Sequence, residues 1–449
     1  MIRKFVCMLM IFAAFNVYAI DFQNLLIESR IVENDSNAHH HLSRLKDLDE
    51  DEKETSKSLA KFSAQQSKEG QLREVSSYLS NLDRYSTQLS LVGEEMAAVE
   101  VMWKRAELRA KYFPPQNKLD LSELDELAID HSVEEDAISV ILNEAKNKQI
   151  VILNEAHHAP VDRSFAMQLA KGLHDKLGFE YLACETFAVG DDKILSKGYV
   201  TEATGAYSNE STFANFLSKA IVDRWKFVSY ETAPELDGTP EYGSREYGMA
   251  KNILDRVLSS KPKAKIFIYV GYGHASKFPK SMNNNDDSKF AAQLSRLTGI
   301  EPLTIDQTFL SANVPGGDTK RALYKSALRK GKAGFPFVLL NKKSVPLKFS
   351  HMRAPQLRQG YDILVAHPTY DLNLQTGRPN WMGDSRFGNL TPHDIPEKFL
   401  PKSGRRVIYA FRRNAPEDAV PVDVVLVRAS KAAPKLMLPP GEFTLEYED

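Results

Sequence analysis

The chain has 449 residues, of which 43% are hydrophobic and 26% charged, and its formal net charge is −1. This composition is that of a globular protein with enough apolar material for a core, and two to three domains are expected at this length. The near-neutral balance argues against nucleic acid and against an anionic membrane surface as partners, because both attract strongly basic proteins.

The N-terminus, residues 1–19, has the features of a signal peptide. Arg3 and Lys4 supply positive charge, the apolar run Phe5–Phe15 follows, and Ala19 provides a small residue at the cleavage site. The apolar run is shorter than the ~20 residues that span a bilayer, which disfavours a membrane anchor. No later segment of the sequence has the length and hydropathy of a membrane helix. We therefore expect an exported chain that is periplasmic or secreted, with no transmembrane segment once matured.

Residues 20–115 are polar and favour helices. The stretch contains no proline before Pro114 and Pro115, and apolar residues recur at helical spacing, as at Leu79 and Leu82. We expect several helices, including a hairpin, that end at the paired prolines.

Residues 116–312 alternate short apolar runs with amphipathic stretches at helical spacing. Such alternation is typical of β–α–β units, which form a parallel sheet with helices on its faces. The apolar runs are Ile150–Leu153, Tyr181–Cys184, Phe227–Tyr230, Ile266–Val270 and Pro302–Ile305. The helical stretches carry Phe165, Leu169 and Leu173, span Thr212–Val222, begin near Ser244, and include Phe290, Leu294 and Leu297.

Residues 313–449 differ again, with apolar runs separated by loops rich in proline and glycine. The predicted strands are Phe335–Leu340, Tyr361–Ala366, Arg406–Phe411, Val420–Val427 and Phe443–Tyr447. They could form a small β-rich domain or extend the main sheet, and both arrangements stay open. The predicted fold class is therefore α/β, with a mostly parallel central sheet flanked by helices, an N-terminal helical region and a β-rich C-terminal extension.

An ionisable side chain follows each of the five predicted strands of the middle region. The carboxyl ends of parallel strands share one edge of a sheet, and open α/β sheets bind ligands in the crevice outside that edge. We therefore expect these side chains to converge. The residues are Glu155, His157 and His158 after the first strand, Glu185 and Glu231 after the next two, Tyr272 and His274 after the fourth, and Asp306 after the fifth.

Carboxylates and imidazoles are the groups that transfer protons and that bind divalent metals such as zinc. The predicted catalytic residues are Glu155, His157, His158, Glu185 and His274. The predicted metal ligands are His157, Glu185, His274 and Asp306. Adjacent side chains of an extended segment point in opposite directions, so one of His157 and His158 is expected to enter the site. The other is expected to pack or to bond a carboxylate behind the site.

A predicted helix start adds charged groups at the same edge. Ser244 is the expected N-cap, and Arg245 and Glu246 follow it. In a β–α–β unit this helix begins where the strands end, so Arg245 could pair with a site carboxylate or hold an anionic substrate. An ordinary helix start, with Glu246 favoured by the helix dipole, is the alternative. Arg245, Glu246 and Tyr272 are the predicted substrate-binding residues.

Several familiar catalytic signatures are absent from the sequence. There is no Gly-x-Ser-x-Gly elbow, no Walker loop and no His-Glu-x-x-His zinc motif. The segment Gly271–Gly273 lacks the third glycine of a dinucleotide fingerprint. Cys184 lies inside a predicted buried strand, where a core cysteine is expected rather than a nucleophile.

These residues resemble the erythromycin esterase / haem-uptake (ChaN-like) superfamily, to which the TraB–Tiki proteases look related. Its members open with a strand and Gly-Glu-x-His or Gly-Glu-x-x-His, similar to Asn154–His158 here, and a second strand ends in Glu, similar to Glu185. A helix then carries Arg-Glu-x-x-Met-Ala-x-Asn, which Arg245–Asn252 matches, and a later strand leads to Gly-His, which Gly273–His274 matches. The resemblance covers Lys148–Asp306.

Activities in this superfamily diverge between ester hydrolysis, metal-dependent peptide cleavage and haem binding, and a shared fold does not fix the function. The leading hypothesis is an exported hydrolase in which His157 or His158, with Glu155, activates water against an ester or amide bond. The substrate would be a small molecule or a peptide. The remaining cluster residues would complete the site, with a divalent metal such as zinc as one version of this hypothesis.

Two further hypotheses stay open beside the hydrolase. One is a haem- or metal-binding protein without turnover, in which His274 with Tyr272, or His157, ligates iron. The other is a non-enzymatic interaction protein that uses its N-terminal helices to contact a partner.

Overall fold

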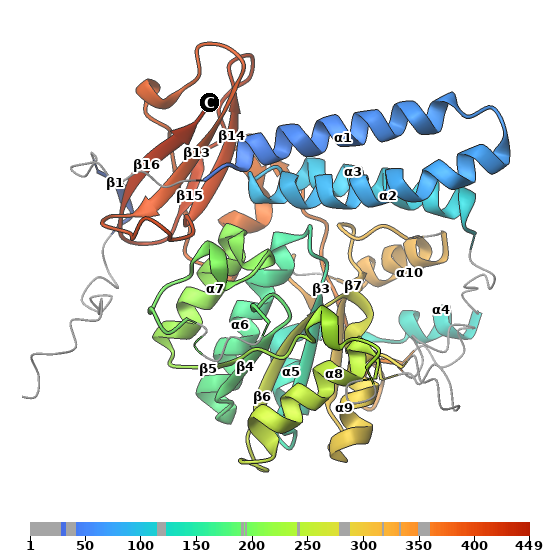
Figure 1. Ribbon diagram of the computed structural model, residues 1–449. Helices are drawn as coiled ribbons and strands as arrows, with labels where there is room; N and C mark the ends of the chain where they lie inside the picture. The colour runs from blue at the N-terminus through green and yellow to red at the C-terminus, as the bar shows by residue number, and fades with distance from the viewer. Residues whose placement is uncertain are drawn as a thin grey trace, which may run out of the picture.

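The computed structural model shows a mixed α/β protein built from three parts (Figure 1). Long helices lie across the top of the view, an α/β core lies below them, and a β-rich part lies beside the helices. The structure describes residues 28–32, 42–114, 123–189, 193, 195–239, 243–277, 288–316, 318–331, 334–348 and 360–449. The predicted signal peptide, residues 1–19, falls outside these ranges. The predicted α/β class is confirmed.

The core is built on an eight-stranded sheet with the strand order β2-β8-β9-β7-β3-β6-β4-β5. From β9 to β5 the neighbouring strands run parallel, whereas β8 is antiparallel to both β2 and β9. The strands are β2 (Val133–Asp136), β3 (Ile150–Glu155), β4 (Tyr181–Cys184), β5 (Lys226–Val228), β6 (Ile266–Gly271), β7 (Leu303–Leu310), β8 (Phe337–Leu340) and β9 (Ile363–Ala366). The five apolar runs of the middle region thus form β3 to β7, and β8 and β9 extend the same sheet from the C-terminal region.

Helices cover both faces of this sheet because its central strands are apolar on both sides. In β3, Val151 and Leu153 pack into one apolar cluster, and Ile150 and Ile152 pack into the other. All four side chains are fully buried. The first face carries α5 (Ala137–Ala145), α6 (Pro160–Leu177) and α7 (Ser211–Val222), and the second carries α4 (Glu123–Asp130), α8 (Arg245–Ile253), α9 (Phe290–Thr298) and α10 (Asp318–Leu328). Cys184 lies in the first cluster as a core residue.

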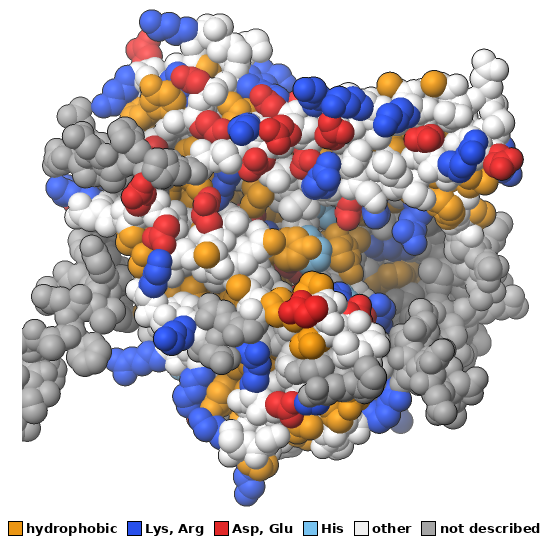
Figure 2. Space-filling view, viewed as in Figure 1, with side chains coloured by type: hydrophobic (Ala, Val, Ile, Leu, Met, Phe, Trp, Pro, Cys, Tyr) orange, Lys and Arg blue, Asp and Glu red, His pale blue; other side chains and the backbone are white. Residues whose placement is uncertain are grey.

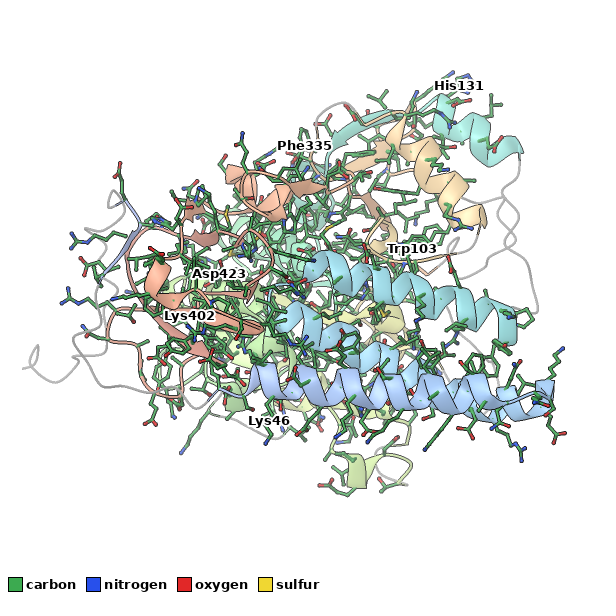
Figure 3. The ribbon with its side chains drawn as sticks, turned by 90° about the horizontal axis from the view of Figure 1, so that it is seen from above. Lys46, Trp103, His131, Phe335, Lys402 and Asp423 are labelled. Atoms are coloured by element: carbon green, nitrogen blue, oxygen red, sulfur yellow. The ribbon has the colours of Figure 1, made fainter. Side chains whose placement is uncertain are left out.

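Three consecutive helices form the N-terminal layer. They are α1 (Arg44–Ala64), α2 (Lys68–Leu91) and α3 (Glu95–Tyr112), and they lie side by side over the core (Figures 1 and 3). Gly93 makes the turn between α2 and α3 at φ 78°, and a Cβ there would collide with the carbonyl of Val424, so this turn needs glycine. Among the described residues, no helix has both the length and the apolar character needed to cross a membrane.

The helical layer is anchored on the edge of the sheet where the parallel strands end. Nε1 of Trp103 in α3 donates a hydrogen bond of 3.2 Å to the carbonyl of Ala312, just beyond β7. At the start of α1, Nη2 of Arg44 donates a bond of 2.6 Å to the carbonyl of Asn209, in the loop before α7. The layer therefore spans the carboxyl edge of the sheet from two anchoring points.

The β-rich part is a four-stranded sheet with the order β1-β16-β13-β14 and two short strand pairs. In β13, Val407, Tyr409 and Phe411 pack against the helical layer, while Ile408 and Ala410 face a second apolar cluster. The strands are β1 (Arg30–Ile31), β10 (Leu372–Asn373), β11 (Arg378–Pro379), β12 (Thr391–His393), β13 (Arg405–Arg412), β14 (Asp423–Arg428), β15 (Leu436–Leu438) and β16 (Glu442–Glu448). Both arrangements that the sequence left open for the C-terminal region therefore occur. β8 and β9 extend the main sheet, and the later strands form a separate β-rich part.

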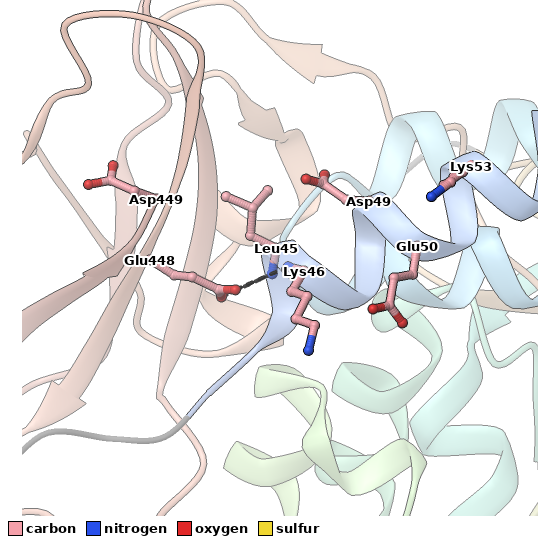
Figure 4. A pocket seen from close by; sticks show the side chains of 7 residues that line it. All are labelled: Leu45, Lys46, Asp49, Glu50, Lys53, Glu448 and Asp449. Carbon is pink, nitrogen blue, oxygen red and sulfur yellow. Dashed lines mark hydrogen bonds between the residues drawn. The ribbon is translucent and has the colours of Figure 1, made fainter.

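The end of β16 caps the first helix of the layer. The side chain of Ser43 makes no capping bond at the start of α1. The carboxylate of Glu448 takes this role, because it accepts the backbone N–H groups of Leu45 and Lys46 at 3.0 Å each (Figure 4). A shallow depression of about 550 Å³ surrounds this cap. A negative charge at a helix N-terminus is favourable, so this contact joins the β-rich part to the helical layer.

We expect Glu448→Ala to lower the free energy of unfolding by about 1–2 kcal/mol, because two N–H groups at the start of α1 lose their acceptor. Urea denaturation followed by circular dichroism measures the change. Glu50→Ala is the control: this exposed glutamate lines the same depression, and its removal should shift stability by less than about 0.5 kcal/mol. Equal effects of the two substitutions would contradict the capping role.

Candidate active site

Side chains from three strand ends and one helix start meet at the carboxyl edge of the sheet. Glu155 ends β3, Glu185 follows β4, His274 follows β6, and Arg245 begins α8. His157 and His274 are each 17% exposed, so both rings reach solvent. Figure 2 shows histidine side chains next to hydrophobic ones in a hollow between the helical layer and the core. Glu155, Glu185 and His274 thus lie together at one edge of the sheet, as expected from the strand ends.

Glu155 and His157 form a carboxylate–imidazole pair, with 2.8 Å between Oε1 and Nδ1. Arg163, in the first turn of α6, donates from Nε to Oε2 of Glu155 at 2.9 Å and from Nη2 to Oε1 at 3.2 Å. Burial alone would raise the pKa of Glu155, but Arg163 and His157 outweigh it and lower this pKa to about 2. Glu155 is therefore ionised at neutral pH and sets the orientation of the imidazole.

The same guanidinium joins this pair to the start of α7. Nη1 of Arg163 donates to Oε2 of Glu210 at 3.0 Å, and Nη2 also donates to the carbonyl of His157 at 2.8 Å. Glu210 is in turn the N-cap of α7 and accepts the N–H of Thr212 at 2.8 Å. Burial would lower the pKa of Arg163, but Glu155 and Glu210 raise it, so the guanidinium keeps its charge.

Glu185 occupies the centre of the cluster with both carboxylate oxygens engaged. Oε2 accepts the N–H of Gly271, and Oε1 accepts Nη2 of Arg245 at 2.9 Å. Arg245 also binds Glu231, through Nε at 2.9 Å and through Nη2. Burial would raise the pKa of Glu185, but His274 and the other charged neighbours lower it, so this carboxylate is also ionised.

Glu246 and His274 form a second carboxylate–imidazole pair, with 2.8 Å between Oε2 and Nδ1. Glu246 also accepts Nζ of Lys289 and the N–H of Phe290, each at 2.8 Å. Burial would raise the pKa of Glu246, but His274 and Lys289 lower it to about 2. Nε2 of His274 points toward Oε1 of Glu185 at 3.6 Å. The imidazole of His274 thus approaches the central carboxylate.

The ring of His157 is enclosed by its neighbours. Tyr207 stacks on it with 3.8 Å between ring centroids and an interplanar angle of 10°, and Tyr272 meets it edge-on at 5.0 Å. Gly271 leaves the room that the ring needs: a Cβ there would lie 2.5 Å from Cε1 and 2.6 Å from Nε2 of His157, and 3.0 Å from Oε2 of Glu185. Nε2 of His157 therefore lies beside the same carboxylate.

The guanidinium of Arg245 lies between two of the predicted metal ligands. Among the described residues, no group of three or more His, Cys, Asp and Glu side chains is placed to hold a metal. Nη2 of Arg245 bonds Glu185, and Nη1 lies 3.4 Å from Nε2 of His274. The positive charge of Arg245 thus lies between the carboxylate of Glu185 and the imidazole of His274.

His158, a predicted catalytic residue, lies behind the cluster and is 1% exposed. Residues 156–158 form a tight turn before α6 instead of an extended segment. Nε2 of His158 lies 2.8 Å from the carbonyl of Asn313 and Nδ1 lies 3.2 Å from the hydroxyl of Tyr272, so of the two expected arrangements the ring packs behind the site and does not bond a carboxylate. Burial lowers its pKa to about 4, so His158 is a neutral residue that joins the end of β3 to the loop after β7.

Asp306, a predicted metal ligand, lies inside β7 instead of just past a strand. The register between β7 and β9 shifts between Asp306 and Leu310, and the carboxylate bonds the backbone there. Oδ1 accepts the N–H of Phe309 at 2.7 Å, and Oδ2 accepts Nδ2 of Asn154 at 2.7 Å. Asn154 thereby ties β3 to β7. Asp306 supports the strand irregularity and does not contact the cluster of Glu185 and the two imidazoles.

Three side chains of the site were not predicted from the sequence. Arg163 is buried in the first turn of α6, but it does not share the helical spacing of Phe165, Leu169 and Leu173, so the apolar pattern gave no signal for it. Glu210 stands immediately before a predicted helix, which marks a cap but not a bond to a buried arginine. Tyr207 lies in a 3₁₀ turn, Tyr207–Asn209, and nothing in its sequence context indicates that it stacks on a histidine.

Comparison of the chain with protein-family models, with curated proteins and with solved structures gave no match.

We expect Gly271→Ala to displace the ring of His157, because the added methyl group would overlap it. The φ of −81° at Gly271 suits alanine, so the collision is the main effect. The measurement is the downfield region of the proton NMR spectrum, where the hydrogen-bonded Nδ1–H of His157 is expected to resonate. This resonance is assigned by its absence in His157→Gln, and it should disappear in Gly271→Ala. Gly273→Ala is the matched control, because a Cβ there meets nothing within 4 Å. Loss of the resonance in both variants would contradict the close approach.

The neutral buried His158 makes the protein less stable as the pH falls. Its pKa is about 4 in the folded state against 6.5 for the free group, so between these values only the unfolded chain takes up the proton. The free energy of unfolding should fall by about 3 kcal/mol from this residue as the pH drops through that window. Urea unfolding at pH 7 and pH 4.5 should show a weaker pH dependence in His158→Gln. The exposed His131→Gln should keep the wild-type dependence, and unchanged dependence in both variants would contradict the assignment.

Proposed function

We propose that this chain is a hydrolase that cleaves an ester or amide bond at the carboxyl edge of its sheet, with His157 as the general base. The proposal rests on one observation: two imidazoles, each bonded through Nδ1 to an ionised glutamate, lie near the same third carboxylate beside a partly exposed arginine. It draws on the esterase branch of the superfamily that residues 148–306 resemble. It also takes the central sheet as mostly parallel, which is why distant residues share one edge.

His157 has the contacts that a general base needs. With its proton on Nδ1, where Glu155 accepts it at 2.8 Å, Nε2 is left as a proton acceptor. A water molecule at Nε2 that attacks a carbonyl carbon would give its proton to this nitrogen. The resulting imidazolium is stabilised by Glu155, which is ionised across the neutral range, and later returns the proton to the leaving alkoxide or amine. Positioned proton transfer of this kind accelerates reactions by about 10²- to 10⁴-fold.

Arg245 has the contacts that an electrophilic group needs. Nε and Nη2 bond carboxylates, while Nη1 faces Nε2 of His274 at 3.4 Å. The side chain is 40% exposed, so Nη1 can reach a carbonyl oxygen that enters the hollow. A preorganised donor directed at a developing oxyanion stabilises the transition state more than the ground state. Glu185 and Glu231 hold the guanidinium in place, and Glu246 holds His274 beside it.

The export predicted from residues 1–19 is part of this proposal, and the enzyme would act in the periplasm or outside the cell. The substrate class remains an ester or amide of a small molecule or peptide. The β-rich part and the helical layer lie outside the segment that resembles the superfamily. Both would therefore help to recognise a substrate or partner specific to this chain.

A metal- or haem-binding function is the second candidate, and one observation favours it. Metal-bound histidines usually donate their other ring nitrogen to a carboxylate, as His157 and His274 do to Glu155 and Glu246. Elemental analysis of the purified mature protein, with a haem titration at micromolar concentration, separates the candidates. Stoichiometric metal or a new haem absorption band would support binding. If the protein hydrolyses esters but contains no stoichiometric metal and gives no new haem band, the guanidinium-based site is supported.

We expect His157→Gln to reduce turnover by about 10²- to 10⁴-fold, because the proton acceptor is lost. The assay is a panel of p-nitrophenyl esters of increasing acyl length and a mixture of short peptides. His158→Gln separates the adjacent histidines and should keep most of the turnover, since its ring is bonded to Asn313 and Tyr272 behind the cluster. His131→Gln, at an exposed histidine, is the control for nonspecific effects of substitution and purification, and its turnover should equal that of the wild type. Undiminished turnover in His157→Gln would rule this mechanism out.

A further inference from the structure

The stack of Tyr207 on His157 is the closest ring pairing in the site. The centroids are 3.8 Å apart and the planes are 10° from parallel, while Tyr272 bounds the ring edge-on at 84°. The hydrogen bond from Nδ1 to Glu155 fixes one edge of the imidazole, and the stack restrains the tilting of the ring about that bond. Nε2 is then presented in one direction, next to Gly271 and the carboxylate of Glu185.

The backbone that carries Tyr207 is tied to the strand end that carries Glu185. The N–H groups of Tyr207 and Ser208 both donate to Oγ1 of Thr186 at 2.9 Å, and Thr186 directly follows Glu185. Gly205 lets the loop approach this closely, because a Cβ at its φ of 157° would overlap the carbonyl of Thr186. The turn with Tyr207 is thus built onto the cluster.

The same turn is held from above by the helical layer. Arg44, at the start of α1, is 5% exposed and donates to the carbonyl of Asn209 at 2.6 Å and to the carbonyl of Leu91 at 2.9 Å. Leu91 ends α2, and Asn209 ends the turn that begins with Tyr207. One buried guanidinium therefore joins two helices of the layer to the segment that stacks on the imidazole.

We propose that Tyr207 is a positioning residue for His157, and that the helical layer holds Tyr207 in place through Arg44. This inference rests on the proposed function, because it assigns a role toward the general base. The stack acts through the face of the ring and not through the hydroxyl, whose pKa burial and the nearby Glu185 raise to about 12, so it stays neutral. A misplacement of a catalytic group by about 1 Å reduces rate by about 10²-fold, so orientation of the imidazole has a measurable effect.

The test compares two substitutions of Tyr207. Tyr207→Leu removes the aromatic face and should lower kcat by about 10- to 100-fold with KM changed by less than about threefold. Tyr207→Phe keeps the face, so it should restore kcat to within about threefold of the wild type. Thermal unfolding of both variants shows whether each is folded at the assay temperature. Equal kcat in Tyr207→Leu and the wild type would overturn the positioning role, as would failure of Tyr207→Phe to rescue.

A spectroscopic measurement keeps this inference separate from the proposed function. The Nδ1–H resonance of His157 should broaden or vanish in Tyr207→Leu and remain in Tyr207→Phe, whatever reaction the protein performs. If His157→Gln retains turnover, the proposed function fails, and this resonance alone decides whether Tyr207 orients the ring. A sharp, unshifted resonance in Tyr207→Leu would overturn the inference even if the hydrolase assignment stands.

Arg44→Met tests the contribution of the helical layer. It keeps an unbranched apolar stem and removes both hydrogen bonds, so the turn that carries Tyr207 loses its bond to the helical layer. We expect a lower kcat than in the wild type, with a smaller loss than in Tyr207→Leu. The double variant should be about as slow as Tyr207→Leu alone, because both changes act through one segment. Losses that multiply in the double variant would show that Arg44 acts elsewhere and would overturn its role as the anchor.

Discussion

The pairing of Glu155 with Arg163 is the interaction on which the geometry of the site depends. Their side chains are 3% and 1% exposed, so two charges have been removed from water. Such a transfer costs several kcal/mol per ion, and it is offset only when the polar atoms of both groups find partners. Here the guanidinium bonds Glu155, Glu210 and the carbonyl of His157, and the carboxylate also bonds the His157 ring. The end of β3 and the starts of α6 and α7 are thereby held in one arrangement.

A second arginine repeats this arrangement nearer to solvent. Arg245 bonds Glu185 and Glu231 as Arg163 bonds Glu155 and Glu210, but its side chain is 40% exposed. Full burial suits a group that only orients its neighbours, because nothing can compete for its hydrogen bonds. Partial exposure is compatible with the substrate contact that we propose for Arg245. The difference in burial therefore separates an arginine that only holds the site together from one whose side chain reaches solvent.

Much of the core could be predicted because its strands are apolar on both sides, and the residue that follows such a run lies at the carboxyl edge. This argument placed Glu155, Glu185 and His274 together from sequence alone. It did not hold for Asp306, since polar residues inside β7 look like the end of a strand although the strand continues to Leu310. It could not assign the adjacent histidines, because the tight turn at residues 156–158 removes the alternation that an extended segment would have.

The contacts that bring the helical layer over the site had no sequence signal for a physical reason. The amphipathic pattern of α1 to α3 predicts that they bury one face, but their anchors are carbonyl groups, which every residue possesses. Trp103 bonds the carbonyl of Ala312, and Arg44 bonds that of Asn209. Both anchoring side chains lie outside residues 148–306, the segment that resembles the superfamily. Because a carbonyl acceptor is the same for every residue type, the place of these helices beside the hollow at His157 follows from the structure and not from the pattern of side chains.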